Sequence, residues 1–224
     1  DVIEIDGLKN FKSFEYNVPG DISSSSFFIV LTILTKNSKL KIRNVNVNDT
    51  RTGIISILKR MNANILFKNK RNYKGEKIAD IHIKFSKNLK SINCPKKYNS
   101  SAIDEFLVIF LVAAKSKGVS IFKNLGELNK KESPRLNIAV AILKKIGVKV
   151  IKKDNDLKIF GNPNLNLKKT YVIEKFRKDH RIFMMSCIAA LAFGGKWKIN
   201  NKDSINSSFP DFLKKLNEIG CNFT

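Results

Sequence analysis

Residues 104–114 read Asp104-Glu105-Phe106-Leu107-Val108-Ile109-Phe110-Leu111-Val112-Ala113-Ala114, an acidic pair followed by nine apolar residues. Nine residues are too few to span a bilayer, which takes about 20 residues in a helix. An aspartate before an apolar run is typical of a helix N-cap, because its carboxylate accepts hydrogen bonds from the first free backbone N–H groups. The stretch therefore predicts a helix that is capped by Asp104.

The same pattern occurs three times along the chain. Asp21 precedes an apolar stretch that ends at Leu34, and Asp179 precedes another that ends at Phe193. A strand-like run, a second helical pattern and a further strand-like run follow each stretch. From the three aspartates to the residues aligned with Gly147, the spacing is 41, 43 and 41 residues. Such a constant spacing indicates duplicated supersecondary units. We expect these units at about 20–100, 101–175 and 176–224.

The order of elements predicts the fold class. Each unit reads helix, strand, helix, strand, and hairpin turns between strands are indicated at Tyr73-Lys74-Gly75-Glu76 and at Asp154-Asn155-Asp156. Alternating helices and strands predict an α/β protein whose sheet is partly parallel. Residues 1–20 fit none of the units. They read as a pair of strands that ends in a hinge at Val18-Pro19-Gly20.

The composition is that of a globular protein of 224 residues, 43% of them hydrophobic. The formal net charge of +23 comes mostly from scattered lysines, since only seven of the 42 basic residues are arginine. Nucleic-acid modules cluster their cations or carry a recognisable motif, and we find neither, so we expect no nucleic-acid partner. The charge favours small anionic substrates instead. Cys94, Cys187 and Cys221 are far apart, which argues against disulfides or a zinc site and fits the cytoplasm.

Two charged motifs stand where helices are expected to begin: Lys131-Glu132-Ser133-Pro134-Arg135-Leu136 and Asp179-His180-Arg181-Ile182. In the first, Ser133 should be the cap and Pro134 the first helical residue. Lys131 and Glu132 would then lie in the preceding loop and Arg135 in the first turn. A helix start favours anions, because its free N–H groups and dipole point outward. Two such sites suggest a substrate that carries phosphate or carboxylate groups.

Together with Ile103-Asp104-Glu105, these motifs resemble the EPSP synthase (5-enolpyruvylshikimate-3-phosphate synthase) family, and the resemblance covers almost the whole chain. It implies an inside-out α/β barrel-type domain of three repeated βαβαββ units, the enolpyruvyl transferase fold. Residues 1–19 would be the tail of a first domain and the hinge, and residues 20–224 nearly all of a second domain. The remainder of the first domain would lie outside this chain.

The family transfers the enolpyruvyl group of phosphoenolpyruvate to the 5-hydroxyl of shikimate 3-phosphate and releases phosphate through a tetrahedral intermediate. The resemblance implies that this chain takes part in that reaction, which needs neither a metal nor an organic cofactor. The implied partners are the two small substrates and the first domain of the same enzyme, with no membrane partner. The implied location is the cytoplasm.

The resemblance also assigns roles to five residues. Asp104 matches the family aspartate that accepts a proton at the sugar hydroxyl, and Glu132 matches the glutamate that exchanges protons with the methylene carbon of phosphoenolpyruvate. Lys131 matches a lysine that contacts shikimate 3-phosphate. Arg135 and Arg181 match arginines that bind phosphoenolpyruvate, a role that suits the planar guanidinium fork.

The sequence departs from the family pattern at Pro134, where the family usually has aspartate. A carboxylate that could orient Arg135 or Lys131 is therefore missing. Thr50-Arg51-Thr52-Gly53 matches one branch of the family, and we interpret it as a helix start. We interpret His180 as a structural residue that bonds neighbouring backbone.

Two other functions remain as alternatives. UDP-N-acetylglucosamine enolpyruvyl transferase shares the fold, and a catalytic cysteine in a loop would favour it. A non-catalytic basic binding module would be favoured by clustered arginines or surface aromatic residues. We find neither feature in the sequence.

Overall fold

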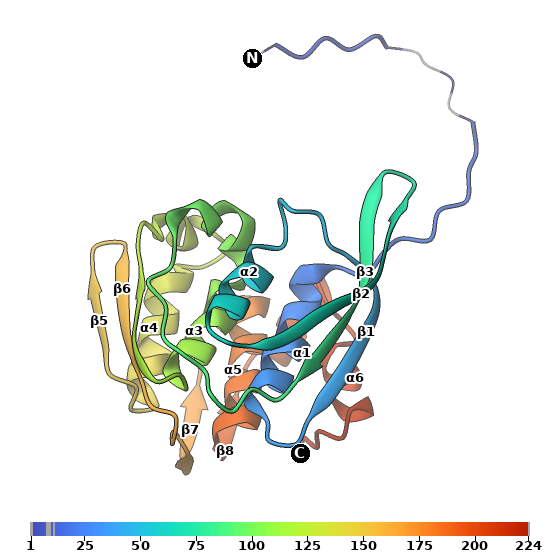
Figure 1. Cartoon of the computed structure of the whole chain (residues 1–224). Helices are drawn as coiled ribbons and strands as arrows, with labels where there is room; N and C mark the ends of the chain where they lie inside the picture. The colour runs from blue at the N-terminus through green and yellow to red at the C-terminus, as the bar shows by residue number, and fades with distance from the viewer. Residues whose placement is uncertain (1, 8–9, 11, 224) are drawn as a thin grey trace.

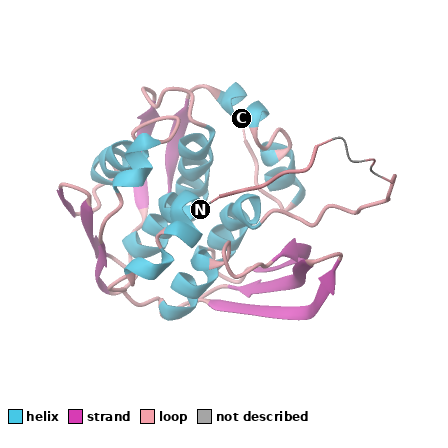
Figure 2. Cartoon of the chain, turned by 90° about the horizontal axis from the view of Figure 1, so that it is seen from above, coloured by secondary structure: helices cyan, strands magenta, loops and turns pink. Residues whose placement is uncertain are grey.

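Three helices lie at the centre of the computed structural model, which describes residues 2–7, 10 and 12–223. They are α1 (Ile22–Leu34), α3 (Phe106–Ala114) and α5 (His180–Phe193), and they contact one another. The strands lie outside them in three groups, as Figures 1 and 2 show from two directions. Helices enclosed by sheets are the inside-out arrangement that the resemblance implied.

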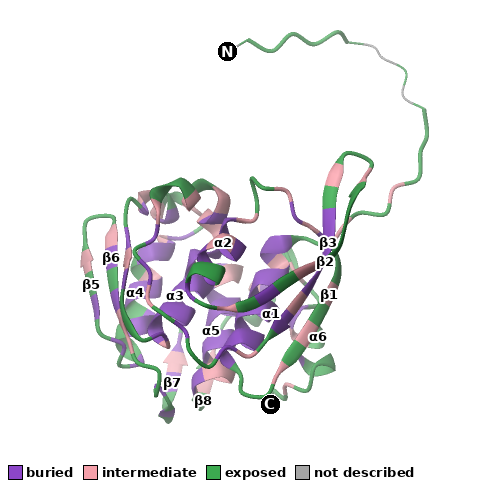
Figure 3. Ribbon diagram, in the orientation of Figure 1, coloured by how far each residue is buried: buried purple, intermediate pink, exposed green. Residues whose placement is uncertain are grey.

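The composition of the central helices explains this arrangement. All nine residues of α3 are buried, and nearly all of α1 is, so both helices are purple along their length in Figure 3. A helix that is apolar all round has no face to turn to water and must be enclosed. The buried hydroxyls of α1 do not interfere, because Ser25, Ser26 and Thr32 donate to backbone carbonyls three or four residues earlier.

The first unit places an antiparallel sheet beside α1. Its strands are β1 (Lys39–Asn46), β2 (Asn64–Tyr73) and β3 (Glu76–Lys84), in the order β1-β3-β2, with α2 (Gly53–Arg60) between β1 and β2. The predicted hairpin joins β2 to β3, and Lys74 and Gly75 take the positive φ values of 48° and 89° that such a tight turn needs.

The second unit repeats this plan. It contains β4 (Gly118–Phe122), α4 (Arg135–Lys145), β5 (Val150–Lys153) and β6 (Asp156–Gly161), and its strand order is β4-β6-β5. The predicted turn at Asp154 joins β5 to β6. Strand β7 (Leu167–Ile173) follows β6 at the end of the second unit, and the third unit contains β8 (Gly194–Ile199) and α6 (Phe212–Glu218).

A parallel pairing flanks each central helix. Strand β7, which precedes α5 in the sequence, pairs in parallel with β8, which follows α5. In the same way, Gly20 before α1 forms a parallel bridge to Val45 after it, and Asn93 before α3 forms one to Ile121 after it. These pairings confirm the prediction of partly parallel sheets.

The outer helices confirm the alignment of the repeats. α2, α4 and α6 are each followed by a residue with positive φ: Asn62 at 67°, Gly147 at 80° and Gly220 at 92°. The next N–H donates to the carbonyl five residues earlier, in the pairs Ala63 to Leu58, Val148 to Leu143 and Cys221 to Leu216. The same helix C-terminal motif therefore occurs three times. It lies at the residues that were aligned by their spacing from Asp21, Asp104 and Asp179.

Three local predictions are wrong. Asp104 lies in the 3-10 helix η2 (Ser100–Glu105) and caps no helix, although Asp21 and Asp179 do cap α1 and α5. Helix α4 begins at Arg135, so Pro134 is the flanking residue and the Ser133 hydroxyl bonds elsewhere.

The predicted strand pair in residues 1–20 is also absent from the described part of that segment, which has only the single bridge at Gly20. Residues 1, 8–9 and 11 lie outside the description. Among the described residues of the segment, Tyr16 and Asn17 contact Tyr73 at the tip of the β2–β3 hairpin, but they do so through its side chain and not through a backbone ladder.

Candidate active site

The charged residues predicted from the two motifs meet in one network, hereafter the charged cluster. It contains the five residues with roles assigned by resemblance and Asp179. They come from η2, from the loop before α4 and from the first turns of α4 and α5. The members of the charged cluster are Asp104, Lys131, Glu132, Arg135, Asp179 and Arg181.

Asp179 joins the two helix starts. One carboxylate oxygen accepts the backbone N–H of Arg181 at 2.9 Å, and the other accepts the Ser133 hydroxyl at 2.7 Å and Arg135 Nε at 2.9 Å. Burial by itself raises the pKa of this carboxyl, but the hydrogen bonds from Arg135 and Ser133 and the Arg135 charge hold the pKa below its ordinary value. Asp179 is therefore ionised at neutral pH.

Arg135 is the central cation of the charged cluster, and its side chain is 1% exposed. Besides Asp179, it donates through Nη1 to Asp104 at 3.3 Å and through Nη2 to Glu132. Three carboxylates thus surround one buried guanidinium. Asp179 orients Arg135 from the neighbouring helix, although Pro134 supplies no carboxylate.

The two predicted proton-transfer groups are the more accessible carboxylates. The side chain of Asp104 is 22% exposed and that of Glu132 is 57% exposed. Lys131 Nζ lies 3.5 Å from Asp104 Oδ1, and Arg181 Nη1 donates to the backbone carbonyl of Asp104 at 3.0 Å. Cations therefore hold Asp104 at its carboxylate and at its backbone carbonyl.

Three further residues adjoin the charged cluster that the sequence did not single out. The Ser23 hydroxyl, in the first turn of α1, donates to Glu105, and Arg51 Nη2 donates to the same hydroxyl at 3.0 Å. Glu105 lies 4.0 Å from Arg181. In the sequence, only its position next to Asp104 could have pointed to Glu105. Nothing distinguishes Ser23, because it lies in a run of four serines.

His180 begins α5 but is not placed as a proton donor at neutral pH. Burial lowers the pKa of its ring, and the charges of Arg181 and Arg135 lower it further against the opposing effect of Asp179. The imidazole is therefore neutral at pH 7.

The cysteines lack the environment of a nucleophile. Burial raises the pKa of Cys94 to about 11 and that of Cys187 to about 12, and it also raises the pKa of Cys221. A nucleophilic cysteine needs a lowered pKa, because the thiolate is the reactive form.

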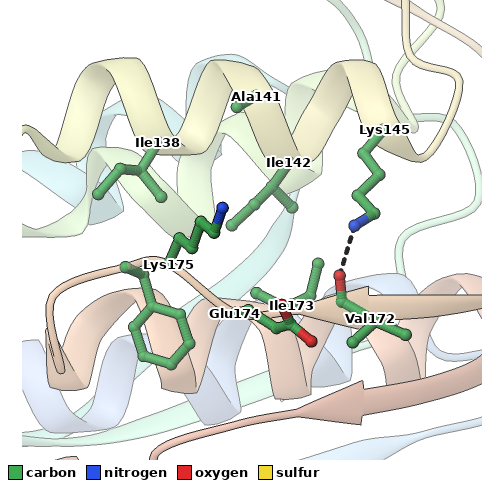
Figure 4. Close-up of a pocket in the computed structure, with 9 residues that line it drawn as sticks. Ile138, Ala141, Ile142, Lys145, Val172, Ile173, Glu174 and Lys175 are labelled. Carbon is green, nitrogen blue, oxygen red and sulfur yellow. Dashed lines mark hydrogen bonds between the residues drawn. The ribbon is translucent and has the colours of Figure 1, made fainter.

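The charged cluster lies apart from the pocket drawn in Figure 4. That pocket of about 470 Å³ lies between α4 and β7, and apolar side chains such as Ile138, Ile142 and Ile173 form most of its wall. None of its lining residues belongs to the charged cluster. In the part of the chain that the structure describes, no helix is long and apolar enough to cross a membrane.

The fold resembles that of enolpyruvyl transferases. The enolpyruvyl transferase NikO from Streptomyces tendae, 14% identical over the matched part, has a TM-score of 0.67 and covers 89% of this chain and 43% of its own. An EPSP synthase structure from Acinetobacter baumannii, 36% identical, has a TM-score of 0.84 and covers 90% of this chain and 46% of its own. The inside-out architecture and the charged helix starts thus define a domain of the enolpyruvyl transferase class.

Sequence comparison narrows this class. The family model of EPSP synthase (3-phosphoshikimate 1-carboxyvinyltransferase) matches residues 1–216, so the chain belongs to the EPSP synthase family. A relative named 3-phosphoshikimate 1-carboxyvinyltransferase from Thermoanaerobacter sp. (strain X514) is 42% identical over 197 residues, 88% of this chain and 45% of the relative. Another from Petrotoga mobilis is 38% identical over 218 residues, 97% of this chain and 50% of the relative. The chain spans about half the length of these curated relatives.

Proposed function

We propose that this chain is the second-domain half of a 3-phosphoshikimate 1-carboxyvinyltransferase. The whole enzyme would transfer the enolpyruvyl group of phosphoenolpyruvate to the 5-hydroxyl of shikimate 3-phosphate and release phosphate. The observation that carries the proposal is the charged cluster. All five residues that the family motifs mark lie in one connected network, in a chain that belongs to the family.

The two accessible carboxylates would move the protons. Asp104 would take the proton of the attacking hydroxyl, and Glu132 would exchange protons at the methylene carbon of phosphoenolpyruvate. Both are accessible to a substrate, since neither is enclosed. Proton transfer by a positioned side chain typically accelerates a reaction by about 10²- to 10⁴-fold.

The cations would hold the anionic substrates. Lys131, 27% exposed, would contact the phosphate of shikimate 3-phosphate, and Arg181, 15% exposed, would bind phosphoenolpyruvate. Arg135 is also assigned to phosphoenolpyruvate, yet it already contacts three carboxylates. Among the described residues, two of its five N–H groups remain without a carboxylate partner, but its side chain is 1% exposed, so a substrate would reach them only if a covering carboxylate moved. Glu132 is the most exposed of the three carboxylates.

The domain organisation forms part of the proposal. Residues 1–19 would be the tail of the first domain and the hinge, and residues 20–224 the second domain, with repeats at about 20–100, 101–175 and 176–224. The exposed side chains of Val2, Ile3 and Ile5 support this, because they are 85–88% exposed and would be covered by the rest of a first domain. The site would then form where two domains close on each other.

The match to the EPSP synthase family favours this function over UDP-N-acetylglucosamine enolpyruvyl transfer. The family match and the connected charged cluster favour it over a basic binding module. A cytoplasmic location remains a prediction from the sequence.

The proposal is tested by assaying the full-length protein that contains this chain for phosphate release. We expect release that requires both phosphoenolpyruvate and shikimate 3-phosphate. The control replaces shikimate 3-phosphate by UDP-N-acetylglucosamine, which should give no release. Release with the second acceptor in place of the first, or with neither, would overturn the proposal.

A further inference from the structure

Glu105 is a buried carboxylate to which the proposed reaction gives no role. Only 4% of its surface is exposed. It lies at the junction of η2 and α3, directly after Asp104. Burying a carboxylate costs free energy unless partners offset the loss of water, so the contacts that Glu105 makes indicate what it does.

Those contacts connect all three repeats. Arg51, in the loop before α2, donates to the Ser23 hydroxyl of the first repeat, and that hydroxyl donates to Glu105 of the second. Glu105 in turn faces Arg181 of the third repeat, with 4.0 Å between Oε1 and Nη1. A hydroxyl has one hydrogen. The Arg51 N–H takes a lone pair of Ser23 Oγ, and the hydroxyl hydrogen goes to Glu105, which accepts it.

Glu105 also restricts the orientation of Arg181. Nη1 of Arg181 donates to the backbone carbonyl of Asp104 at 3.0 Å and forms an ion pair with Glu105 at 4.0 Å. The guanidinium is planar and rigid. Two contacts to Nη1 therefore limit the movement of this end of the group and keep it beside Asp104.

The surroundings of Glu105 make its charge sensitive to pH. Burial raises the pKa of its carboxyl, and the nearby charge of Asp104 raises it too, while the Ser23 hydrogen bond and the charges of Arg181 and Arg51 oppose that shift. These four residues are the polar and charged groups that face Glu105 from α1, from the loop before α2, from η2 and from α5.

We propose that Glu105 is a positioning residue that holds Arg181 in its substrate-binding orientation and links it, through Ser23 and Arg51, to the start of α1. The proposal rests on the proposed function for what Arg181 binds. It does not rest on that function for the contact itself.

The first test is Glu105→Gln in the full-length protein, which keeps the shape and an oxygen acceptor but removes the charge. We expect the KM for phosphoenolpyruvate to rise about tenfold or more, the factor expected from losing one charge-assisted contact. The kcat should change much less, and the KM for shikimate 3-phosphate should stay near that of the wild type. An unchanged KM for phosphoenolpyruvate in a folded variant would overturn the proposal.

The second readout is the pH profile, which a merely structural residue would not move. In the wild type, the KM for phosphoenolpyruvate should rise at the acid end as Glu105 takes up a proton and loosens Arg181. Glu105→Gln should abolish that rise. Ser23→Ala removes a hydrogen bond that lowers the pKa of Glu105, so it should move the rise to higher pH. A profile that is the same in all three proteins contradicts the proposal.

Asp80→Asn is the matched control. Asp80 is likewise buried and charge-paired, but it lies in β3 and contacts Lys41 and Asn69. This variant should lower the melting temperature without changing either KM or the pH profile. An equal change in both variants would reduce the role of Glu105 to general stability and overturn the proposal.

A double-mutant cycle separates this inference from the proposed function, because it needs no turnover. Glu105→Gln and Arg181→Gln are combined, and stability is measured by urea unfolding. We expect the double variant to lose clearly less stability than the sum of the single losses. If the two losses of stability simply add, Glu105 does not hold Arg181 and the proposal is overturned. Coupling in a protein without EPSP synthase turnover would keep the contact and reject the proposed function.

Discussion

Arg135 determines the geometry of the charged cluster because it contacts Asp104, Glu132 and Asp179 together. A cation beside a helix N-terminus is poorly placed with respect to the helix dipole. From the sequence, the two charged helix starts suggested an anionic substrate. At Arg135, carboxylates of the protein itself already offset the unfavourable placement of the cation.

We predict that Arg135→Met strongly destabilises the protein. It leaves Asp179 buried without its cation, and breaking a buried pair from one side typically costs about 3–5 kcal/mol. Urea unfolding at pH 7 measures this loss. Asp179→Asn in the same chain removes the unpaired charge, so the double variant should lose less than the sum of the single losses. Additive losses would contradict the pairing.

The pH dependence of this pair has a definite sign. The folded-state pKa of Asp179 lies below its ordinary value of 3.8, so the stability it contributes is present above that value and is lost as the pH falls through the folded pKa. In Arg135→Met the buried, unpaired carboxyl should take up a proton at higher pH. The difference in stability between the variant and the wild type should therefore shrink on acidification, and a difference that grows would be inconsistent with this account.

Asp104 and Glu132 carry a different prediction, because they are partly exposed and contribute to chemistry more than to packing. Asp104→Asn and Glu132→Gln in the full-length enzyme should each lower kcat by about 10²- to 10⁴-fold. The melting temperature should change little. Steady-state kinetics and thermal unfolding of the same samples test this. A variant with a near-normal rate would show that its carboxylate was assigned the wrong role.

Single residues were predictable from the sequence where their partner is local. Asp21 and Asp179 cap helices through N–H groups two or three residues away, and that pattern is visible in the sequence. The burial of Arg135 was not predictable, because its partner Asp179 is 44 residues away. Glu105 escaped notice for the same reason, since Ser23 is 82 residues away.

At the scale of elements, the start of α2 shows how two repeats are brought together. A Cβ atom at Gly53 would lie 2.3 Å from Ser101 Oγ and 2.7 Å from the Ser101 backbone carbon. The glycine of Thr50-Arg51-Thr52-Gly53 thus lets α2 pack directly on η2, which carries Asp104. The same motif places Arg51 against Ser23. It was correctly interpreted as a helix start, but its contact with the second repeat is not visible in the sequence.

We predict that Gly53→Ala destabilises the protein by about 1–3 kcal/mol, the usual cost of overpacking a close contact. Helix propensity alone predicts the opposite sign, because alanine favours a helix over glycine by roughly 1 kcal/mol. Thermal or urea unfolding therefore decides between them. Gly20→Ala is the control, since a Cβ there meets its neighbours at ordinary distances of 3.7 Å or more. If Gly53→Ala is more stable than the wild type, then η2 can shift away from α2 and make room for the added Cβ.

The elements also show where prediction from sequence stopped. The three central helices, both hairpins and the matched helix ends at Asn62, Gly147 and Gly220 follow local patterns, and they are present. The start of α3 was misplaced because Asp104 reads as a cap, whereas the Arg135 and Lys131 side chains occupy its carboxylate. A tertiary contact here replaces the local one.

At the scale of the whole molecule, the charge of the chain and the charge of its site differ. The chain carries a formal net charge of +23, but in the charged cluster and its neighbours each cation has a carboxylate partner close by. The excess positive charge lies elsewhere and can draw anionic substrates toward the protein only at long range. Close binding of two phosphates and a carboxylate calls for further cations, which we expect the first domain to supply.

This expectation leads to a prediction for the chain by itself. The 224 residues expressed alone should fold, because α1, α3 and α5 form a continuous buried core, but they should not turn over phosphoenolpyruvate with shikimate 3-phosphate. Circular dichroism should show a cooperative thermal transition, and a phosphate-release assay should show no rate above background.

Adding the rest of the enzyme as a second polypeptide supplies the control. Turnover should appear only in the mixture, and Glu132→Gln in the chain should suppress it again. Substantial turnover by the chain alone would contradict a site shared between two domains. The absence of a cooperative transition would instead show that the three repeats need the first domain in order to fold.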